Sequence, residues 1–174
     1  MAGSLILLDS VTASTSATVT LGTTDWDNSY DVYMVTFNNV LPDTDASHLD
    51  VRFTKTTDNS VDSSSNYDRA VKILKANTSF GTGTSTNADT FYLDYMGTAG
   101  QEQANGVLYL FNFNNASEYS FITCETAGKS EDGHTRSYVG GGVLTVAQAT
   151  NGVSFYASSG NIASGEFKLY GLRK

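Results

Sequence analysis

The stretch HLDVRF, residues 48–53, shows the pattern that decides the fold class. Leu49, Val51 and Phe53 alternate with the charged residues Asp50 and Arg52, as in a β-strand with one face in a core and the other in water. No longer window shows a helical period of 3.6 residues, so we expect no helix. Similar alternating runs predict eleven strands, at about residues 4–12, 17–21, 30–38, 49–54, 67–75, 90–95, 106–113, 118–126, 136–146, 152–157 and 165–172.

Segments rich in Gly, Ser, Thr, Asn and Asp separate these strands. The longest are predicted loops at residues 56–66, 77–89 and 126–134. No internal repeat, linker or charge block divides the 174 residues, so we expect one domain spanning residues 1–174. Many short strands with long polar loops predict an all-β fold, a two-sheet antiparallel β-sandwich of jelly-roll type.

The aromatic residues indicate where the core lies. Phe53, Phe111, Phe121 and Phe167 occupy alternating positions in predicted strands, and we expect all four in the core. Cys124 is the only cysteine, so it forms no disulfide within the chain, and its place in an alternating strand predicts a small buried residue.

Five residues are candidates for an interface or for surface recognition. The segment YDVYMVTF, residues 30–37, is apolar on both strand faces, which suits either a central strand or a subunit contact through Tyr33 and Val35. Tyr170, in the last predicted strand, would flank that contact. Trp26 lies between two aspartates and is expected to cover one end of the sandwich. The alternative is that Trp26, with a loop tyrosine such as Tyr67, stacks on a sugar.

Charge and hydropathy bound the partners. The net charge is −8, and the ten Lys and Arg residues are scattered, whereas nucleic-acid binding needs clustered positive charge. The apolar run near the N-terminus, residues 5–8, is too short for a signal peptide or a membrane span. We therefore expect a protein made in the cytoplasm, with neither nucleic acid nor membrane as a partner.

The sequence predicts no enzyme and no cofactor. His48 and His134 lack neighbouring ligands or a nucleophile and are interpreted as solvated loop residues. The acidic segments 43–45 and 58–68 offer the oxygen ligands that calcium prefers, but their spacing matches no EF-hand. The pairs Asp43 with Asp45 and Asp25 with Asp27 are close in sequence, and they are better explained as caps of turn amides than as paired catalytic carboxylates.

Two stretches resemble one protein family. Residues 26–70 contain Tyr-Asp-x-Tyr, an apolar strand, Asn-x-Val-x-Pro-x-Thr-Asp, an amphipathic strand and a Ser/Asp-rich loop that ends in Tyr. Residues 160–174 end in Lys-Leu-Tyr-Gly-Leu-Arg-Lys. Together they cover about a third of the chain and resemble small jelly-roll virion proteins of tailed bacteriophages, which are capsid decoration (cement) proteins or tail-fibre domains.

The resemblance implies a structural protein on the exterior of a phage particle, made in the bacterial host. The first hypothesis is a decoration protein that binds the head lattice as a homotrimer, contacts the major capsid protein and stabilises it. The second is a tail-fibre or receptor-binding accessory domain that recognises host-surface glycan. A third, a glycan-cleaving enzyme, would need two carboxylates on one concave face.

Overall fold

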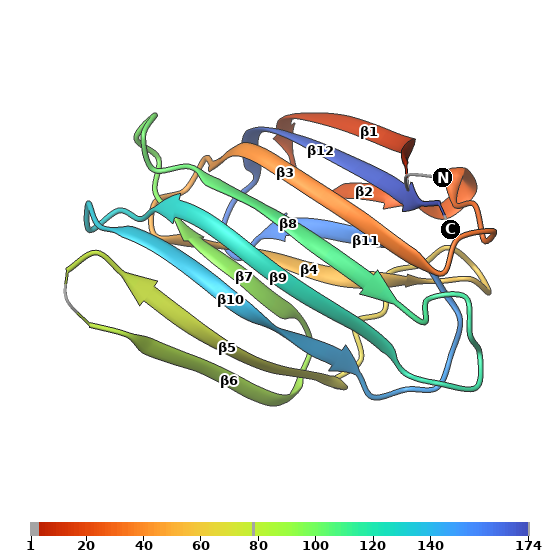
Figure 1. The fold of residues 1–174 in the computed structure, drawn as a ribbon. Coiled ribbons are helices and arrows are strands. Elements are labelled where there is room, and N and C mark those ends of the chain that lie inside the picture. Colours follow the sequence, from red (N-terminus) through yellow and green to blue (C-terminus); the bar gives the residue numbers. More distant parts are fainter. Residues whose placement is uncertain (1–3, 78, 174) are drawn as a thin grey trace.

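A computed structural model describes residues 4–77 and 79–173, and Figure 1 shows their fold. These residues form twelve strands and one turn of 3-10 helix, η1 (Thr23–Asp25). The strands are β1 (Leu5–Ser16), β2 (Val19–Gly22), β3 (Val32–Pro42), β4 (Ser47–Lys55), β5 (Tyr67–Lys75), β6 (Gly81–Ala88), β7 (Phe91–Met96), β8 (Ala104–Phe111), β9 (Ser120–Lys129), β10 (Thr135–Leu144), β11 (Thr150–Ala157) and β12 (Ile162–Leu172). All eleven predicted strands are present, with ends that differ by a few residues.

The twelfth strand, β6, lies inside the predicted loop at 77–89. Its sequence GTGTSTNA contains no large apolar residue, so alternation gave no signal there. The strand forms because β5 offers it a free edge, to which it pairs antiparallel, with Thr84 opposite Ala70 and Thr82 opposite Lys72. Threonine is also favoured on a pleated surface. The predicted loop at 126–134 is likewise shorter, since β9 continues to Lys129.

The strands form two antiparallel sheets, which confirms the predicted β-sandwich. The large sheet has eight strands in the order β1-β12-β3-β8-β9-β10-β5-β6. The small sheet has four, in the order β2-β11-β4-β7, and lies behind the large sheet in Figure 1. Apart from the hairpins β5–β6 and β9–β10, the eight remaining strands have the order β1-β12-β3-β8 in one sheet and β2-β11-β4-β7 in the other.

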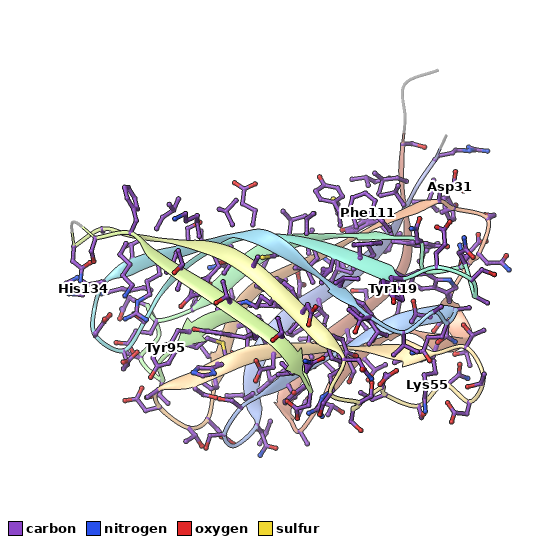
Figure 2. All side chains as sticks on the ribbon, turned by 90° about the horizontal axis from the view of Figure 1, so that it is seen from below. Asp31, Lys55, Tyr95, Phe111, Tyr119 and His134 are labelled. Atoms are coloured by element: carbon purple, nitrogen blue, oxygen red, sulfur yellow. The ribbon has the colours of Figure 1, made fainter. Side chains whose placement is uncertain are left out.

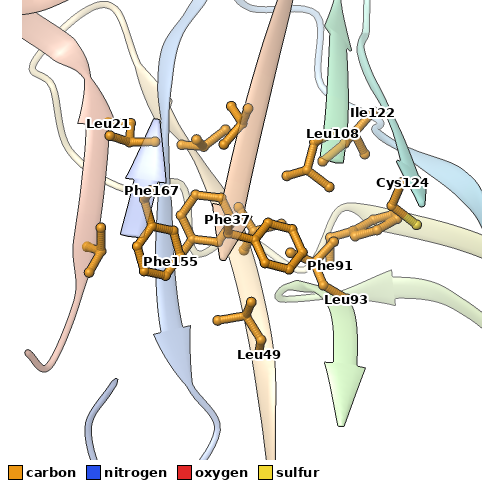
Figure 3. Packing of buried hydrophobic residues seen from close by; sticks show 14 of the residues in the cluster. Leu21, Phe37, Leu49, Phe91, Leu93, Leu108, Ile122, Cys124, Phe155 and Phe167 are labelled. Atoms are coloured by element: carbon orange, nitrogen blue, oxygen red, sulfur yellow. The ribbon is translucent and has the colours of Figure 1, made fainter. Parts of the chain in front are cut away.

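The core lies between the sheets and is built by side chains from both (Figure 3). Phe37 of β3 and Phe167 of β12 lie on the large sheet, and their rings pack against Phe155 of β11 in the small sheet. All three side chains have no exposed surface, and burying a phenylalanine stabilises a fold by about 1.5–3 kcal/mol. Phe53 and Cys124 are also buried, as predicted.

The large sheet extends beyond the small one at β10, β5 and β6. Arg69 covers the inner side of this extension, with its guanidinium 4.6 Å from the ring centre of Tyr92 and 5.8 Å from that of Tyr138. The two tyrosine hydroxyls are 2.7 Å apart and hydrogen-bonded. Aromatic rings and one buried cation therefore close the sandwich where the small sheet ends.

Candidate interaction face

Three of the five predicted interface residues lie in the core. Tyr33, Val35 and Tyr67 have no exposed surface, so in this fold none of them reaches a partner. The reason for Tyr33 and Val35 is the parity of β3: its odd-numbered residues 33, 35 and 37 point inward, while Val32 and Met34 lie half-buried on the opposite face. The prediction of a contact through one face of this strand thus pointed to the wrong residues.

Tyr67 is a structural residue rather than a loop tyrosine. Its hydroxyl donates a hydrogen bond to the carbonyl of Asp62 at 2.9 Å and accepts one from the backbone N–H of Phe53 at 3.0 Å. Burial raises the pKa of Tyr67, which keeps the hydroxyl protonated at any physiological pH. Tyr67 therefore holds the 56–66 loop against β4.

Trp26 covers one end of the sandwich, as the favoured interpretation predicted. Its ring stacks on Tyr33, with ring centres 3.8 Å apart, and packs against Phe113. The indole N–H donates to the side-chain oxygen of Asn114 at 2.8 Å, and the Asn114 amide donates to the Tyr33 hydroxyl at 2.8 Å. Burial raises the pKa of Tyr33 to about 12. This network fixes the segment that follows η1.

The remaining surface of Trp26 borders a pocket of about 470 Å³ at this end of the sandwich. Most of the other lining groups are polar, and they include Asp27, Asn28, Thr56 and Asn151. A half-buried indole beside hydroxyl, amide and carboxylate groups has the chemistry of a sugar subsite. The structure thus leaves the alternative interpretation of Trp26 open.

An extended apolar surface covers the outer side of the large sheet, the side that faces away from the small sheet. Two cross-strand rows form it. The first, the tyrosine row, consists of paired neighbours on six strands: Leu7, Tyr170, Met34, Tyr109, Thr123 and Gly141. The second, the phenylalanine row, holds the pair Leu5 and Leu172 and the paired series Val32, Phe111, Phe121 and Val143. We call these two rows the outer apolar face.

Several side chains of the outer apolar face are strongly exposed. The exposed fractions are 53% for Leu7, 50% for Leu5, 44% for Phe121 and 37% for Tyr109. Figure 2 labels Phe111 where side chains stand out from this side of the large sheet. A shallow hollow of about 290 Å³ lies within the face, lined by Leu5, Met34, Tyr109 and Leu172 among others. Such a surface on an acidic chain is a candidate interaction site.

The prediction that Phe111 and Phe121 lie in the core is wrong. Both lie on the outer apolar face, opposite one another on β8 and β9. The strand β9 turns Ile122 and Cys124 inward, so Phe121 points outward by alternation. An aromatic residue in an alternating strand predicts a buried position only when the inward parity is known. Of the predicted interface residues, only Tyr170 lies half-buried on this face.

A third row, the charged row, borders the outer apolar face. It contains the paired neighbours Ser10, Lys168, Thr36, Val107, Glu125 and Val139. Lys168 forms an exposed ion pair with Glu166 at 3.0 Å. Lys168 lies on β12, the second strand on one side of the line between β3 and β8. Glu125 lies on β9, the second strand on the other side.

The acidic loops bind backbone and neighbouring side chains, as the capping interpretation predicted. Asp43 accepts a hydrogen bond from the backbone N–H of Asn161 at 2.8 Å, and Asp27 accepts one from the N–H of Ser29 at 2.9 Å. These bonds hold the pKa of both carboxyl groups below its ordinary value. Within residues 4–77 and 79–173, no three His, Cys, Asp or Glu side chains are grouped so as to hold a metal ion.

His48 departs from the prediction of a solvated loop residue. It lies on β4 and is half-buried, with its ring stacked on Tyr92 at 4.4 Å between centres and packed against Tyr95. Burial is the main cause that lowers the pKa of its imidazole. His134 lies in the tight connection between β9 and β10, as predicted.

A scan against protein-family models finds no match for this chain, and a search of curated proteins finds none either. Among the described residues, no helix is long and apolar enough to cross a membrane.

Proposed function

We propose that this chain is a structural virion protein of a tailed bacteriophage, and specifically a capsid decoration protein that binds the assembled head and stabilises it. The observation that carries the proposal is the outer apolar face. Contiguous apolar surface on an otherwise polar protein indicates a site that another protein covers. A decoration protein works through such contacts and needs no catalytic group.

The strand order supports the proposal. We interpret the eight strands that remain without the β5–β6 and β9–β10 hairpins as a jelly roll, because the orders β1-β12-β3-β8 and β2-β11-β4-β7 are those of its two four-stranded sheets. Successive strands cross between the sheets except at β4 and β7, which pair within the small sheet. The two hairpins then widen one sheet and so enlarge its outer side. This architecture agrees with the resemblance to phage virion jelly rolls.

The mechanism would be mass action. A protein that binds only the assembled lattice stabilises it in proportion to its own affinity and concentration. Its partners would be the major capsid protein and other copies of itself, for which the family resemblance predicts a homotrimer. It would be made in the bacterial cytoplasm and would lie on the exterior of the particle.

The test is the thermal stability of phage heads with and without the protein. Heads assembled without it should melt at a lower temperature, and adding the purified protein back should restore the melting temperature. The variant Tyr109→Lys, which places a charge in the outer apolar face, should fail to restore it, whereas the matched variant Thr84→Lys on β6 should succeed. Unchanged melting after removal of the protein would contradict the proposal.

A second function is favoured by the pocket beside Trp26, namely recognition of a host-surface glycan by a tail-fibre domain. Trp26 is the only tryptophan in the chain, so its fluorescence reports ligands in this pocket directly. Binding of a host oligosaccharide should shift or quench this emission in a saturable way. A glycan array without hits, together with constant emission, would exclude this function.

A further inference from the structure

We infer that the outer apolar face is covered by a second copy of this chain, packed face to face about a two-fold axis that runs parallel to the strands, between β3 and β8. The inference rests on the proposed function and changes two parts of it: the protein would bind the head as a dimer in place of the homotrimer, and the outer apolar face would join the two copies, so that Tyr109→Lys would act on heads by breaking the dimer. It rests on three features of the rows described above: their position about that axis, their charges and the sizes of their side chains.

The position follows from the strand order. From β1 to β10 the rows cross the six strands β1, β12, β3, β8, β9 and β10, a width of about 24 Å at roughly 4.8 Å per strand. The line between β3 and β8 divides them into three strands on either side. A two-fold axis along this line leaves the position of every row along the strand direction unchanged. It exchanges the three strands on one side of the line with the three on the other. It therefore places β12 of one copy over β9 of the other, and β1 over β10.

The charges of the charged row match under this operation. Lys168 lies on β12 and Glu125 lies on β9, and the two belong to one row through the pairs with Thr36 and Val107. The axis brings Lys168 of each copy over Glu125 of the other, so two opposite-charge pairs form at once. Lys168 also pairs with Glu166 of its own chain. The ammonium group of lysine has three N–H donors, so it can contact Glu125 of the second copy as well.

The tyrosine row matches in size, whereas the phenylalanine row places Val32 over Phe111 and Leu172 over Phe121. In the tyrosine row the axis places Leu7 over Gly141 of the second copy, and Tyr170 over Thr123. Near the axis, Met34 meets Tyr109. A large side chain thus faces a small one at the outer positions of this row, which lets the two sheets approach to the usual distance of about 10 Å.

An isologous contact of this kind closes at two copies, because each copy uses the same surface. It therefore predicts a dimer in solution, and a trimer would need a different surface. A different virion protein or a lipid surface on this face would have no reason to match a lysine and a glutamate placed symmetrically about one line of the sheet.

The test is a charge-reversal cycle followed by sedimentation equilibrium, which measures the dimer dissociation constant. Lys168→Glu and Glu125→Lys each create two like-charge contacts across the axis, and each should weaken the dimer by about tenfold or more. The double variant restores opposite charges in both contacts and should return to within about threefold of the original protein. Lys72→Glu, on β5 of the same face but beyond the six strands, is the matched control and should change nothing.

Folding of every variant is checked by its far-UV circular dichroism and its melting curve at low concentration. A monomer or a trimer at all concentrations would overturn the inference, and so would a double variant that stays as weak as the single ones. The proposed function is tested separately. If a monomeric charge variant still stabilises phage heads, the inference loses its link to function while decoration stands; if the dimer forms and heads are unaffected, decoration fails and the dimer stands.

Discussion

Two buried charged side chains, Asp94 and Arg69, destabilise this sandwich because some of their polar atoms have no hydrogen-bond partner. Asp94 has no exposed surface, and one of its carboxylate oxygens has no hydrogen-bond partner. The other accepts from the N–H of Tyr95 at 2.8 Å. Arg69 is almost as deeply buried, and two of its nitrogens are unpartnered, although tyrosine rings surround its guanidinium. Removing an ionised group from water destabilises a fold unless partners compensate.

Asp94→Asn should make stability less dependent on pH. Burial raises the pKa of Asp94 to about 7 from an ordinary value of 3.8, so between these values the folded state binds a proton that the unfolded state has released. Folding stability therefore falls as the pH rises through this window and stays low above it. The variant should be more stable than the original protein at pH 8, on the order of 4 kcal/mol, and about equally stable near pH 4.

Urea unfolding at both pH values measures this difference. Asp94→Ala is the companion variant, since it removes the charge but also the acceptor for the Tyr95 N–H. It should gain less than Asp94→Asn. The quantity compared is the gain in unfolding free energy of Asp94→Asn over the original protein. If this gain is no larger at pH 8 than at pH 4, the raised pKa of Asp94 is contradicted.

Asn114→Ala should loosen the segment that carries Trp26. The Asn114 side chain accepts from the Trp26 indole and donates to the Tyr33 hydroxyl and to the carbonyl of Tyr30. Loss of these bonds should lower the free energy of unfolding by about 1–3 kcal/mol. The single tryptophan should also emit at longer wavelength in the folded protein. Unchanged emission would show that ring stacking alone holds Trp26.

The strands of this protein differ in which of their two sides carry apolar residues. In β3 and β9 both sides carry apolar residues, one for the core and one for the outer apolar face. In β4 the charged residues Asp50 and Arg52 alternate with the core residues Leu49, Val51 and Phe53, but Asp50 is only 4% exposed, so the prediction that it faces water is wrong. In β6 neither side is apolar, and only its pairing with β5 makes it a strand. Alternation is therefore informative where one side is polar, and ambiguous or silent elsewhere.

Two phenylalanine truncations distinguish the two sides. Phe37→Ala removes a fully buried ring of β3 and should cost about 3–5 kcal/mol of unfolding free energy. Phe121→Ala removes a ring that is 44% exposed on β9 and should change stability by less than about 0.5 kcal/mol. Urea unfolding is measured at concentrations below the dimer dissociation constant, so that loss of the intersubunit contact does not contribute. Equal costs for the two variants would contradict the assignment of Phe121 to the outer side.

The two sheets depend on each other, because neither has a core of its own. Phe155 comes from the small sheet and packs on Phe37 and Phe167 from the large one. The small sheet has only four strands, and its inner side would be exposed if the sheets separated. Separate unfolding of one sheet would therefore expose the apolar side of both.

Unfolding of the sandwich should be a single cooperative transition. Far-UV circular dichroism follows the strands of both sheets, while the fluorescence of Trp26 follows one end of the sandwich. The two signals should give the same urea midpoint and slope. Separate midpoints would show that the Trp26 end, or the β5–β6 extension, unfolds independently.

The sequence by itself determined the strand content, the two-sheet class and the burial of Phe53, Phe167 and Cys124, because these follow from local alternation. The tertiary structure decided which side of β3 and β9 faces the core, and so excluded Tyr33 and Val35 from any interface. It also assembled the outer apolar face from residues far apart in the chain, such as Leu7, Met34 and Tyr109. The physical reason is that cross-strand neighbours are set by sheet order and register, which no single strand encodes.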